Sequence, residues 1–287
     1  MMYTIFDIIG VPILVIVFLV LFVLESKFQL RKRVQQRWRR IFINSIVSLP
    51  AFTLLRFLLL PVIVWICQLN QTYHFGLAYL FKLPYWIETI IVFLVLDYGN
   101  YFWHILNHKF TFLWRFHLVH HTDHDLDITT AFRFHFGEMV GSVIFRGTIS
   151  FLSGATPVQV LIYEIIFEAA TQFHHSNLKL PFKFERILNY FIVTPRMHGI
   201  HHSIIKEETN SNYSVVFSFW DRLHSTAILN VKQDSIVMGT ATYTNKEELT
   251  IGYLLRLPFT KIRLDESIKD ASGAGEISKL EKNKLVQ

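Results

Sequence analysis

Residues 86–125 read WIETIIVFLVLDYGNYFWHILNHKFTFLWRFHLVHHTDHD, and this stretch decides the fold. Its first part, from Trp86 to Leu106, is an apolar run long enough for a helix that crosses a bilayer. Histidines follow at the end of the run, first spaced as HxxxH and then as HxxHH. Residues three and four positions apart share one face of a helix, so each group directs its imidazole rings toward one point. The stretch therefore predicts a membrane helix that leads into a cluster of metal-binding side chains.

Histidines recur in three short boxes along the chain. The boxes are His104 and His108, then His117, His120 and His121, then His198, His201 and His202. If 14 histidines were scattered over 287 positions, even one HxxHH would arise only about once in thirty arrangements, and this chain has two. Neutral histidine is the commonest protein metal ligand and suits Fe, Zn, Cu and Ni. Eight such ligands exceed the needs of one ion, so the boxes predict a centre with two metal ions.

Further side chains are candidates to complete or surround this centre. His175 ends an expected helix and is the favoured ninth ligand, whereas His174 would point about 100° away from it. Carboxylates in apolar sequence need a metal, a histidine N–H or water as a partner. The other candidates, as extra ligands or as groups that orient a ligand, are Asp97, His124, His135, Glu164, Glu168 and Asn177. An orienting role is favoured for His124, both roles are open for His135, and a hydrogen bond between helices is equally expected for Glu164.

The composition of the chain is that of a membrane protein. Of its residues 52% are hydrophobic and only 17% are charged, whereas a soluble domain carries about a quarter charged residues. Apolar stretches at 8–24, 41–67 and 86–106 predict membrane spans. Shorter stretches at 140–152 and 158–173 predict a hairpin that enters the bilayer only in part. The first stretch lacks the features of a signal peptide and is expected to remain as an anchor.

The charge pattern indicates how the chain sits in the membrane. Seven residues between Glu25 and Arg40 are Lys or Arg, and apolar stretches flank the run on both sides. Such a run is typical of a cytoplasmic loop rather than of a nucleic-acid-binding arm. Counting spans from this loop puts every histidine box on the cytoplasmic face.

We therefore predict an all-α, polytopic membrane helical bundle with a cytosolic, histidine-rich metal-binding cap. A single membrane-embedded domain is expected at 1–264, with the boxes within 97–226, and a disordered tail at 265–287. The expected location is the bacterial inner membrane or the endoplasmic reticulum.

At these boxes the sequence resembles the fatty acid hydroxylase / sterol desaturase superfamily of membrane di-iron enzymes. The likeness covers about Leu96 to Thr226 and keeps the family's order of HxxxH, HxxHH, a lone His before Asn, and HxxHH. The stretches LDITTAFRFHFGE at 126–138 and TNSNYSVVFSFWDRLHST at 209–226 are also similar to family segments. The chain departs from the family at His224, where an aromatic residue is frequent, and at Thr171, where some members carry a further histidine. Carried over residue by residue, the implied ligands are His104, His108, His117, His120, His121, His175, His198, His201 and His202.

The resemblance implies an O2-dependent oxidoreductase that hydroxylates or desaturates a lipid of the sterol or fatty acyl type. It implies two iron ions, which zinc can replace in purified material, with O2 as co-substrate. No catalytic residue beyond the metal centre is expected, because the protein's task is to hold the metals, exclude water and present a C–H bond. Electrons would come from an external donor, cytochrome b5-like or ferredoxin-type, and the basic loop is a candidate docking face for an acidic carrier. No nucleic acid is expected as a partner.

Two other functions remain as alternatives. A zinc-dependent membrane hydrolase would use HExxH, which is absent from the sequence, or two histidines and a carboxylate at an open metal site. A non-catalytic metal-binding or transport protein would place its ligands along a path through the membrane, whereas the predicted boxes gather on one side.

Overall fold

The computed structural model describes residues 6–263, and the tail predicted at 265–287 lies outside the described residues. The longer helices are α2 (Val11–Lys27), α3 (Arg37–Leu54), α4 (Leu60–Tyr73), α5 (Tyr85–Lys109), α6 (Thr111–His121), α7 (Phe136–Ser153) and α8 (Pro157–His175). The shorter helices are α9 (Phe182–Leu188), α10 (Pro195–His201), α11 (Lys206–Thr209), α12 (Phe219–Leu223) and α13 (Ile251–Arg256). Single 3₁₀ or π-helical turns are η1 (Phe6–Gly10), η2 (Leu55–Leu59), η3 (Leu77–Tyr79), η4 (Ile128–Phe132), η5 (Gln233–Ser235) and η6 (Leu257–Phe259). Residues 6–263 contain isolated bridges but no strand, which confirms the all-α prediction.

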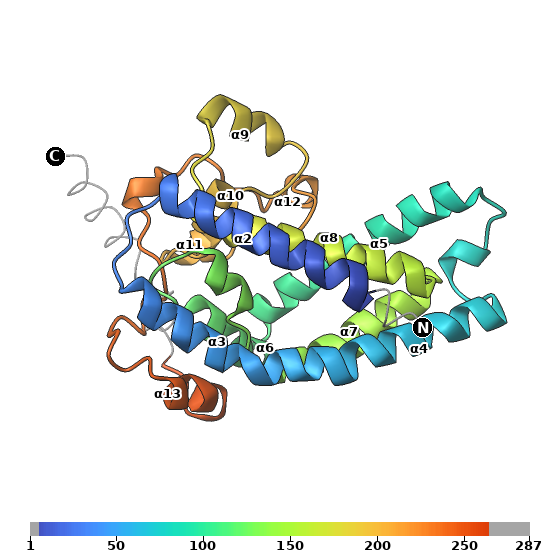
Figure 1. Ribbon diagram of the computed structural model, residues 1–287, viewed down its shortest axis with the longest axis horizontal. Helices are drawn as coiled ribbons and strands as arrows, with labels where there is room; N and C mark the ends of the chain where they lie inside the picture. Colours follow the sequence, from blue (N-terminus) through green and yellow to red (C-terminus); the bar gives the residue numbers. More distant parts are fainter. Residues whose placement is uncertain (1–5, 264–287) are drawn as a thin grey trace, which may run out of the picture.

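The long helices extend away from a cap of short elements (Figure 1). Helices α9, α10, α12 and α13 lie at the cap end, and the connection between α4 and α5 lies at the other end. Three segments are long and apolar enough to cross a membrane, at Phe6–Lys27, Arg37–Tyr79 and Tyr85–Lys109. They contain the three spans predicted from the sequence, so the chain is an integral membrane protein with a helical bundle.

The second span is one continuous helical rod. Helix α3 continues through the π-helical turn η2 into α4, with Pro50 inside α3 and Pro61 at the start of α4. A proline removes a backbone donor, and a π-helical turn is one of the ways in which a helix absorbs such a defect. Arg56 in this turn pairs with Asp7 of η1 at 2.8 Å, where both side chains are partly exposed. The charge in the middle of the apolar stretch therefore faces a carboxylate.

Helices α7 and α8 form the predicted hairpin, and both are longer than the apolar stretches from which the hairpin was predicted. The turn between them is closed by Gly154, whose φ of 75° favours glycine, and by a capping box in which Thr156 pairs with Gln159. A buried cluster that includes Ile63, Leu96 and Tyr163 packs the hairpin against α4 and α5. The helices extend into polar sequence because their polar side chains face the interior of the protein.

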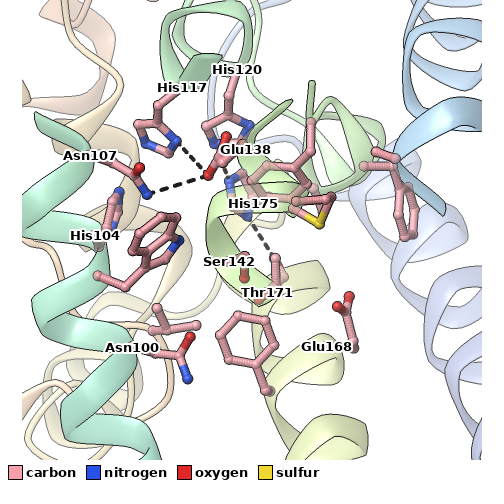
Figure 2. A pocket seen from close by; sticks show the side chains of 18 of the residues that line it. Asn100, His104, Asn107, His117, His120, Glu138, Ser142, Glu168, Thr171 and His175 are labelled. Carbon is pink, nitrogen blue, oxygen red and sulfur yellow. Dashed lines mark hydrogen bonds and ion pairs between the residues drawn. The ribbon is translucent and has the colours of Figure 1, made fainter. Parts of the chain in front are cut away.

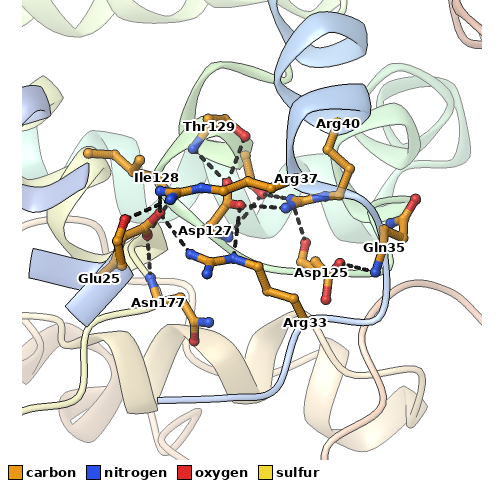
Figure 3. A network of polar contacts seen from close by, with 12 residues as sticks. Glu25, Arg33, Gln35, Arg37, Arg40, Asp125, Asp127, Ile128, Thr129 and Asn177 are labelled. Atoms are coloured by element: carbon orange, nitrogen blue, oxygen red, sulfur yellow. Dashed lines mark hydrogen bonds and ion pairs between the residues drawn. The ribbon is translucent and has the colours of Figure 1, made fainter. Parts of the chain in front are cut away.

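The basic stretch that follows α2 ties the N-terminal helices to the segment after box two (Figure 3). Glu25, near the end of α2, is fully buried and accepts backbone N–H bonds from Ile128 and Asn177 at 3.1 and 2.8 Å. Arg33 and Arg37 pair with the same carboxylate at 3.3 and 2.8 Å. The loop is thus bound to the cap through a carboxylate that is itself inaccessible to water.

Arg40, in the first turn of α3, lies at the centre of this network of buried ion pairs. Its buried guanidinium donates to both carboxylate oxygens of Asp123, at 2.9 and 2.7 Å, and also to Asp127. Burial alone would raise the pKa of Asp123, but the charges of Arg40 and Arg133 outweigh it and hold the pKa well below its usual value. Asp123 is therefore ionised, and the pair is a true buried ion pair.

Arg31 connects the same loop to box three. Its side chain is buried, and it donates to the carbonyl of Pro195 at 3.2 Å and to Gln233 at 2.5 Å. It lies so close to Gly199 that a Cβ there would be 2.2 Å from its Nη1 atom. Four of the loop's arginines, Arg31, Arg33, Arg37 and Arg40, are therefore used inside the fold. The predicted docking face on this loop is correspondingly small.

We predict that Asp123→Asn lowers the thermal stability of the detergent-solubilised protein. The substitution leaves the buried guanidinium of Arg40 without its bidentate partner, a loss worth about 3–5 kcal/mol. Differential scanning fluorimetry measures the shift. The control is Glu247→Gln, which breaks the exposed pair with Arg39 and should leave the melting temperature unchanged. Equal shifts in the two variants would contradict a central role for the buried Arg40–Asp123 ion pair.

Candidate metal centre

Four segments of chain bring the nine predicted ligands into one buried region. Box one ends α5, box two lies on α6, His175 ends α8, and box three lies on α10 and the residue after it. Five side chains form a first group, His104, His108, His117, His121 and His201, and four form a second group, His120, His175, His198 and His202. Within each group one nitrogen of every ring lies within 4.8 Å of the others. The groups adjoin, since the rings of His121 and His202 stack with centroids 4.5 Å apart.

In the first group, hydrogen bonds fix the outward ring nitrogens of His104 and His201, and the inward nitrogens of four rings have no partner. The Nδ1 atoms of His104 and His201 donate to the carbonyls of Tyr213 and Ser211, at 2.8 and 2.7 Å. Nδ1 therefore carries the proton, and Nε2 presents a lone pair to the interior. The Nε2 atoms of His108, His117, His121 and His201 are buried without any hydrogen-bond partner. Buried polar atoms without partners are rare in native proteins, and a metal ion would satisfy all of these.

The second group shows the same convergence at shorter range. The Nε2 atom of His175 lies 3.0 Å from those of His120 and His198, and His198 lies 3.1 Å from His202. With metal–nitrogen bonds of about 2.1 Å, ligands at right angles lie roughly 3.0 Å apart. Four imidazole nitrogens at this spacing fit around one ion, and the all-nitrogen donor set suits iron, zinc or copper.

The electrostatic state of the rings also suits metal binding. Burial lowers the pKa of His175 and of His201 to about 3, so both rings are neutral at physiological pH. Burial lowers the pKa of His120, His198 and His202 well below its usual value as well. Neutral imidazole is the form that binds metals.

The segment that supplies the orienting carbonyls is itself held by two carboxylates. Asp221 accepts the backbone N–H groups of Tyr213 and Ser214 at 2.8 and 2.9 Å. Asp97 accepts those of Val216 and Phe217, at 3.3 and 3.1 Å, and the indole N–H of Trp220 at 2.8 Å. Within residues 6–263, Asp97, predicted to be a ligand or to orient one, forms no hydrogen bond with a histidine and instead holds this segment.

The other candidates lie outside both groups. The ring of His174 lies at a tilt against that of His198, with centroids 4.2 Å apart, and its Nδ1 atom bonds the carbonyl of Val215. His124 bonds the carbonyl of Tyr243 at 2.7 Å, and His135 accepts the N–H of Gly137 and so caps α7. The remaining three are Asn177, which bonds the backbone of Arg31, Glu164, which pairs with Arg146 across the hairpin, and Glu168.

Glu168 lies seven residues before His175 on α8, about 10 Å along the helix axis, which is too far for it to share a metal. It lines a cavity of about 90 Å³ that reaches both groups (Figure 2). Histidines of both groups form one side of this cavity, and its walls are mostly apolar, with Phe52 and Leu55 from the second span, Trp103 and Phe167. The cavity therefore joins the metal region to the membrane-spanning part of the protein.

Glu138 is a functional candidate that sequence reasoning missed. It lies in the first turn of α7, is 5% exposed, and accepts the Nδ1–H of His117 at 3.0 Å. A carboxylate in this position fixes the ring and makes it a stronger ligand. The stretch RFHFGE drew attention to His135, but no spacing rule links Glu138 to a histidine 21 positions earlier.

Comparisons with known proteins show what the chain is similar to. Residues 89–226 match the family model described as fatty acid hydroxylase. The ornithine lipid hydroxylase OlsE of Rhizobium tropici is 30% identical over 147 residues, which are 50% of this chain and 42% of the relative. An alkylglycerol monooxygenase of Xenopus tropicalis is 31% identical over 48% of this chain and 30% of its own length. The cholesterol 25-hydroxylase of Rattus norvegicus is 24% identical over 48% of this chain and 46% of its own length.

In each case the chain spans less than half the length of the relative that it matches. No solved structure shows a significant match. The resemblance noted in the sequence is confirmed by the family model.

We predict that one substitution in each group removes metal from that group. His201→Ala in the first group and His120→Ala in the second should each lower the content from two ions per chain to about one, because each removes a ligand from one group only. Elemental analysis by mass spectrometry measures the content. His224→Ala is the control, because that exposed ring bonds Tyr98 outside both groups. A full complement in His201→Ala or His120→Ala, or a loss in the control, would contradict the assignment.

A second prediction concerns Glu138. Glu138→Gln keeps an oxygen that can accept the Nδ1–H of His117, whereas Glu138→Ala removes it. We expect metal affinity to fall roughly 10- to 100-fold in the alanine variant and much less in the glutamine variant. Competition with a chelator gives the affinities. Equal affinities in the two variants would show that the hydrogen bond to His117 does not matter.

Proposed function

Residues 89–226 belong to the fatty acid hydroxylase family, and on this premise we propose that the chain is a membrane-bound di-iron oxygenase that hydroxylates or desaturates a lipid with O2. The observation that carries the proposal is the convergence of nine histidines into two adjoining groups. The relatives are named hydroxylases and monooxygenases, which favours hydroxylation over desaturation. Their names refer to an ornithine lipid, an alkylglycerol and cholesterol, so the proposed substrate class is lipid.

The two histidine groups would hold the two iron ions. Bound iron supplies what no side chain provides, the reduction of O2 and the oxidation of an unactivated C–H bond. Burial keeps rings such as those of His175 and His201 neutral, and hydrogen bonds from Nδ1 atoms to Ser211, Tyr213 and Glu138 aim three of the rings. These acceptors fix the orientation of the rings and direct the opposite nitrogens toward the metal positions.

The cavity beside the histidines is suited to an apolar substrate. Phe52 and Leu55 in its wall belong to the second membrane span, so a lipid could reach the cavity from the bilayer. Apolar walls exclude water, which protects a reactive centre from side reactions. The same walls leave the lipid few orientations, and this limits which C–H bond faces the histidines.

The proposed orientation places the centre on the cytoplasmic side. Asp125, four residues after box two, accepts the backbone N–H groups of Val34 and Gln35, both at 2.8 Å. The histidines and the basic loop therefore share one end of the bundle, and basic loops are retained in the cytoplasm. An external carrier of the cytochrome b5 or ferredoxin type could supply electrons there.

The donor set favours this function over the two alternatives. A zinc hydrolase needs an open site, with a carboxylate in one common arrangement, whereas these groups contain five and four histidines and no acid. A transporter needs ligands along a path, whereas these lie at one end of α5 and α8.

The proposal is tested by mass spectrometry of total lipids from cells that express the chain under ¹⁸O2. We expect a lipid that gains one ¹⁸O atom, or loses two hydrogens, in cells with the wild-type chain. The matched control is the double variant His120→Ala, His201→Ala, which should accumulate the unmodified lipid. An identical lipid profile in both strains, with iron present in the wild-type protein, would refute the oxygenase.

A further inference from the structure

One histidine of the centre reaches the surface. Eight of the nine rings are buried, and His108 alone is partly exposed. It lies one residue before the end of α5 and lines a second cavity of about 290 Å³. This cavity shares no lining residue with the cavity assigned to the lipid. The centre therefore has two separate approaches, one from the membrane spans and one at the edge of His108.

An aromatic side chain in the wall of this cavity lies beside two of the metal-binding rings. Trp114 of α6 lines the same cavity, and its ring centroid lies 4.9 Å from that of His108 and 5.3 Å from that of His121. Both histidines belong to the first group. A molecule in this cavity thus contacts the ring of His108 directly and reaches that of His121 through Trp114.

Cations surround this approach. Lys109, Lys206 and Arg263 line the cavity, and no acidic side chain does. An adjoining cavity of about 300 Å³, which shares Ile204 and Thr240 with the first, is lined by Arg31, Lys32 and Lys246 and by one acid, Asp125. Arg263 pairs with Glu248 at 2.7 Å. Within residues 6–263, Lys109 and Lys206 form no ion pair, so their charges are available to a partner.

We propose that this basic surface, formed by Lys109, Lys206 and Arg263 around His108 and Trp114, is the docking site of an acidic one-electron carrier protein. The inference rests on the proposed function. Hydroxylation converts R–H, O2, two electrons and two protons into R–OH and water, so the carrier must dock and transfer one electron twice in each turnover. Because lipid and carrier use different cavities, the substrate can stay bound throughout.

The size and charge of the surface suit a transient partner. Electron-transfer encounters are among the smallest protein interfaces, below about 1,200 Å² in total, and rely on charge complementarity for fast association. Such complexes weaken as salt screens the charges. A carrier that must leave after each electron gains from a small, salt-sensitive contact.

The test uses the full chain and two pre-reduced acidic probes, a soluble cytochrome b5 domain and a [2Fe–2S] ferredoxin. The variant is the double charge reversal Lys109→Glu, Lys206→Glu. The control is Lys82→Glu, Lys183→Glu, which changes the net charge equally at two exposed lysines outside both basic cavities. Stopped-flow absorbance follows oxidation of the carrier by the iron-loaded chain at low and high salt. Calorimetry measures binding of the oxidised carrier to the zinc-loaded chain, where no electron moves.

We expect at least one carrier to react with the wild-type chain at a rate that falls with salt. The charge reversal should slow this rate and weaken binding by about tenfold or more, and should remove most of the salt dependence. The control should behave as the wild type. Dithionite, a small reductant that needs no docking site, should reduce all three proteins equally.

Unchanged carrier kinetics in the charge-reversal variant would overturn the docking site, as would the absence of salt-sensitive binding of either carrier to the wild type. Failure of the underlying function looks different. In that case dithionite and O2 would give no lipid oxidation by the wild-type chain, whatever the carriers do.

Discussion

The structure depends on one constraint, that nine imidazoles, eight of them buried, must converge with their lone pairs facing one another. Four helices end at this point, and lone pairs that meet without a cation or a donor are destabilising. Hydrogen bonds from the opposite nitrogens to Ser211, Tyr213 and Glu138 keep the rings from turning away. Asp97 and Asp221 in turn hold the carbonyl-bearing segment. The stability of the cap and the affinity for metal are therefore linked, because binding satisfies atoms that the fold leaves without partners.

Residues at the ends of the N-terminal helices and in the loop between them also hold the histidine-bearing segments in place, although they belong to neither histidine group. Glu25 and Arg40 bind the segment after box two, and Arg31 packs on the glycine inside box three. These buried charges fix the cap against the spans and so fix where the cavity proposed for the lipid meets the histidines. On the far side the cap leaves His108 at the surface beside free lysines. The membrane side and the basic side of the centre are thus separated by the histidines themselves.

Some of this was predictable from the sequence and some was not, for physical reasons. The spacing of histidines on a helix is local information, so the nine rings could be singled out, but their division into five and four depends on how α5, α6, α8 and α10 meet. The backbone carbonyls that orient the rings, such as that of Tyr213, could not be predicted, because every residue type carries the same carbonyl. The sequence of the basic loop does not reveal whether its arginines face lipid headgroups or buried carboxylates. The structure shows that three of them pair with the buried carboxylates of Glu25 and Asp123. The hairpin was expected to be shorter because its polar residues face inward, which hydropathy alone does not reveal.

The most direct test of the central claim is anomalous diffraction at the iron edge from crystals of the iron-loaded protein. Two peaks are predicted, one among His104, His108, His117, His121 and His201 and the other among His120, His175, His198 and His202, each about 2.1 Å from imidazole nitrogens. A single peak, or peaks remote from these rings, would contradict the account.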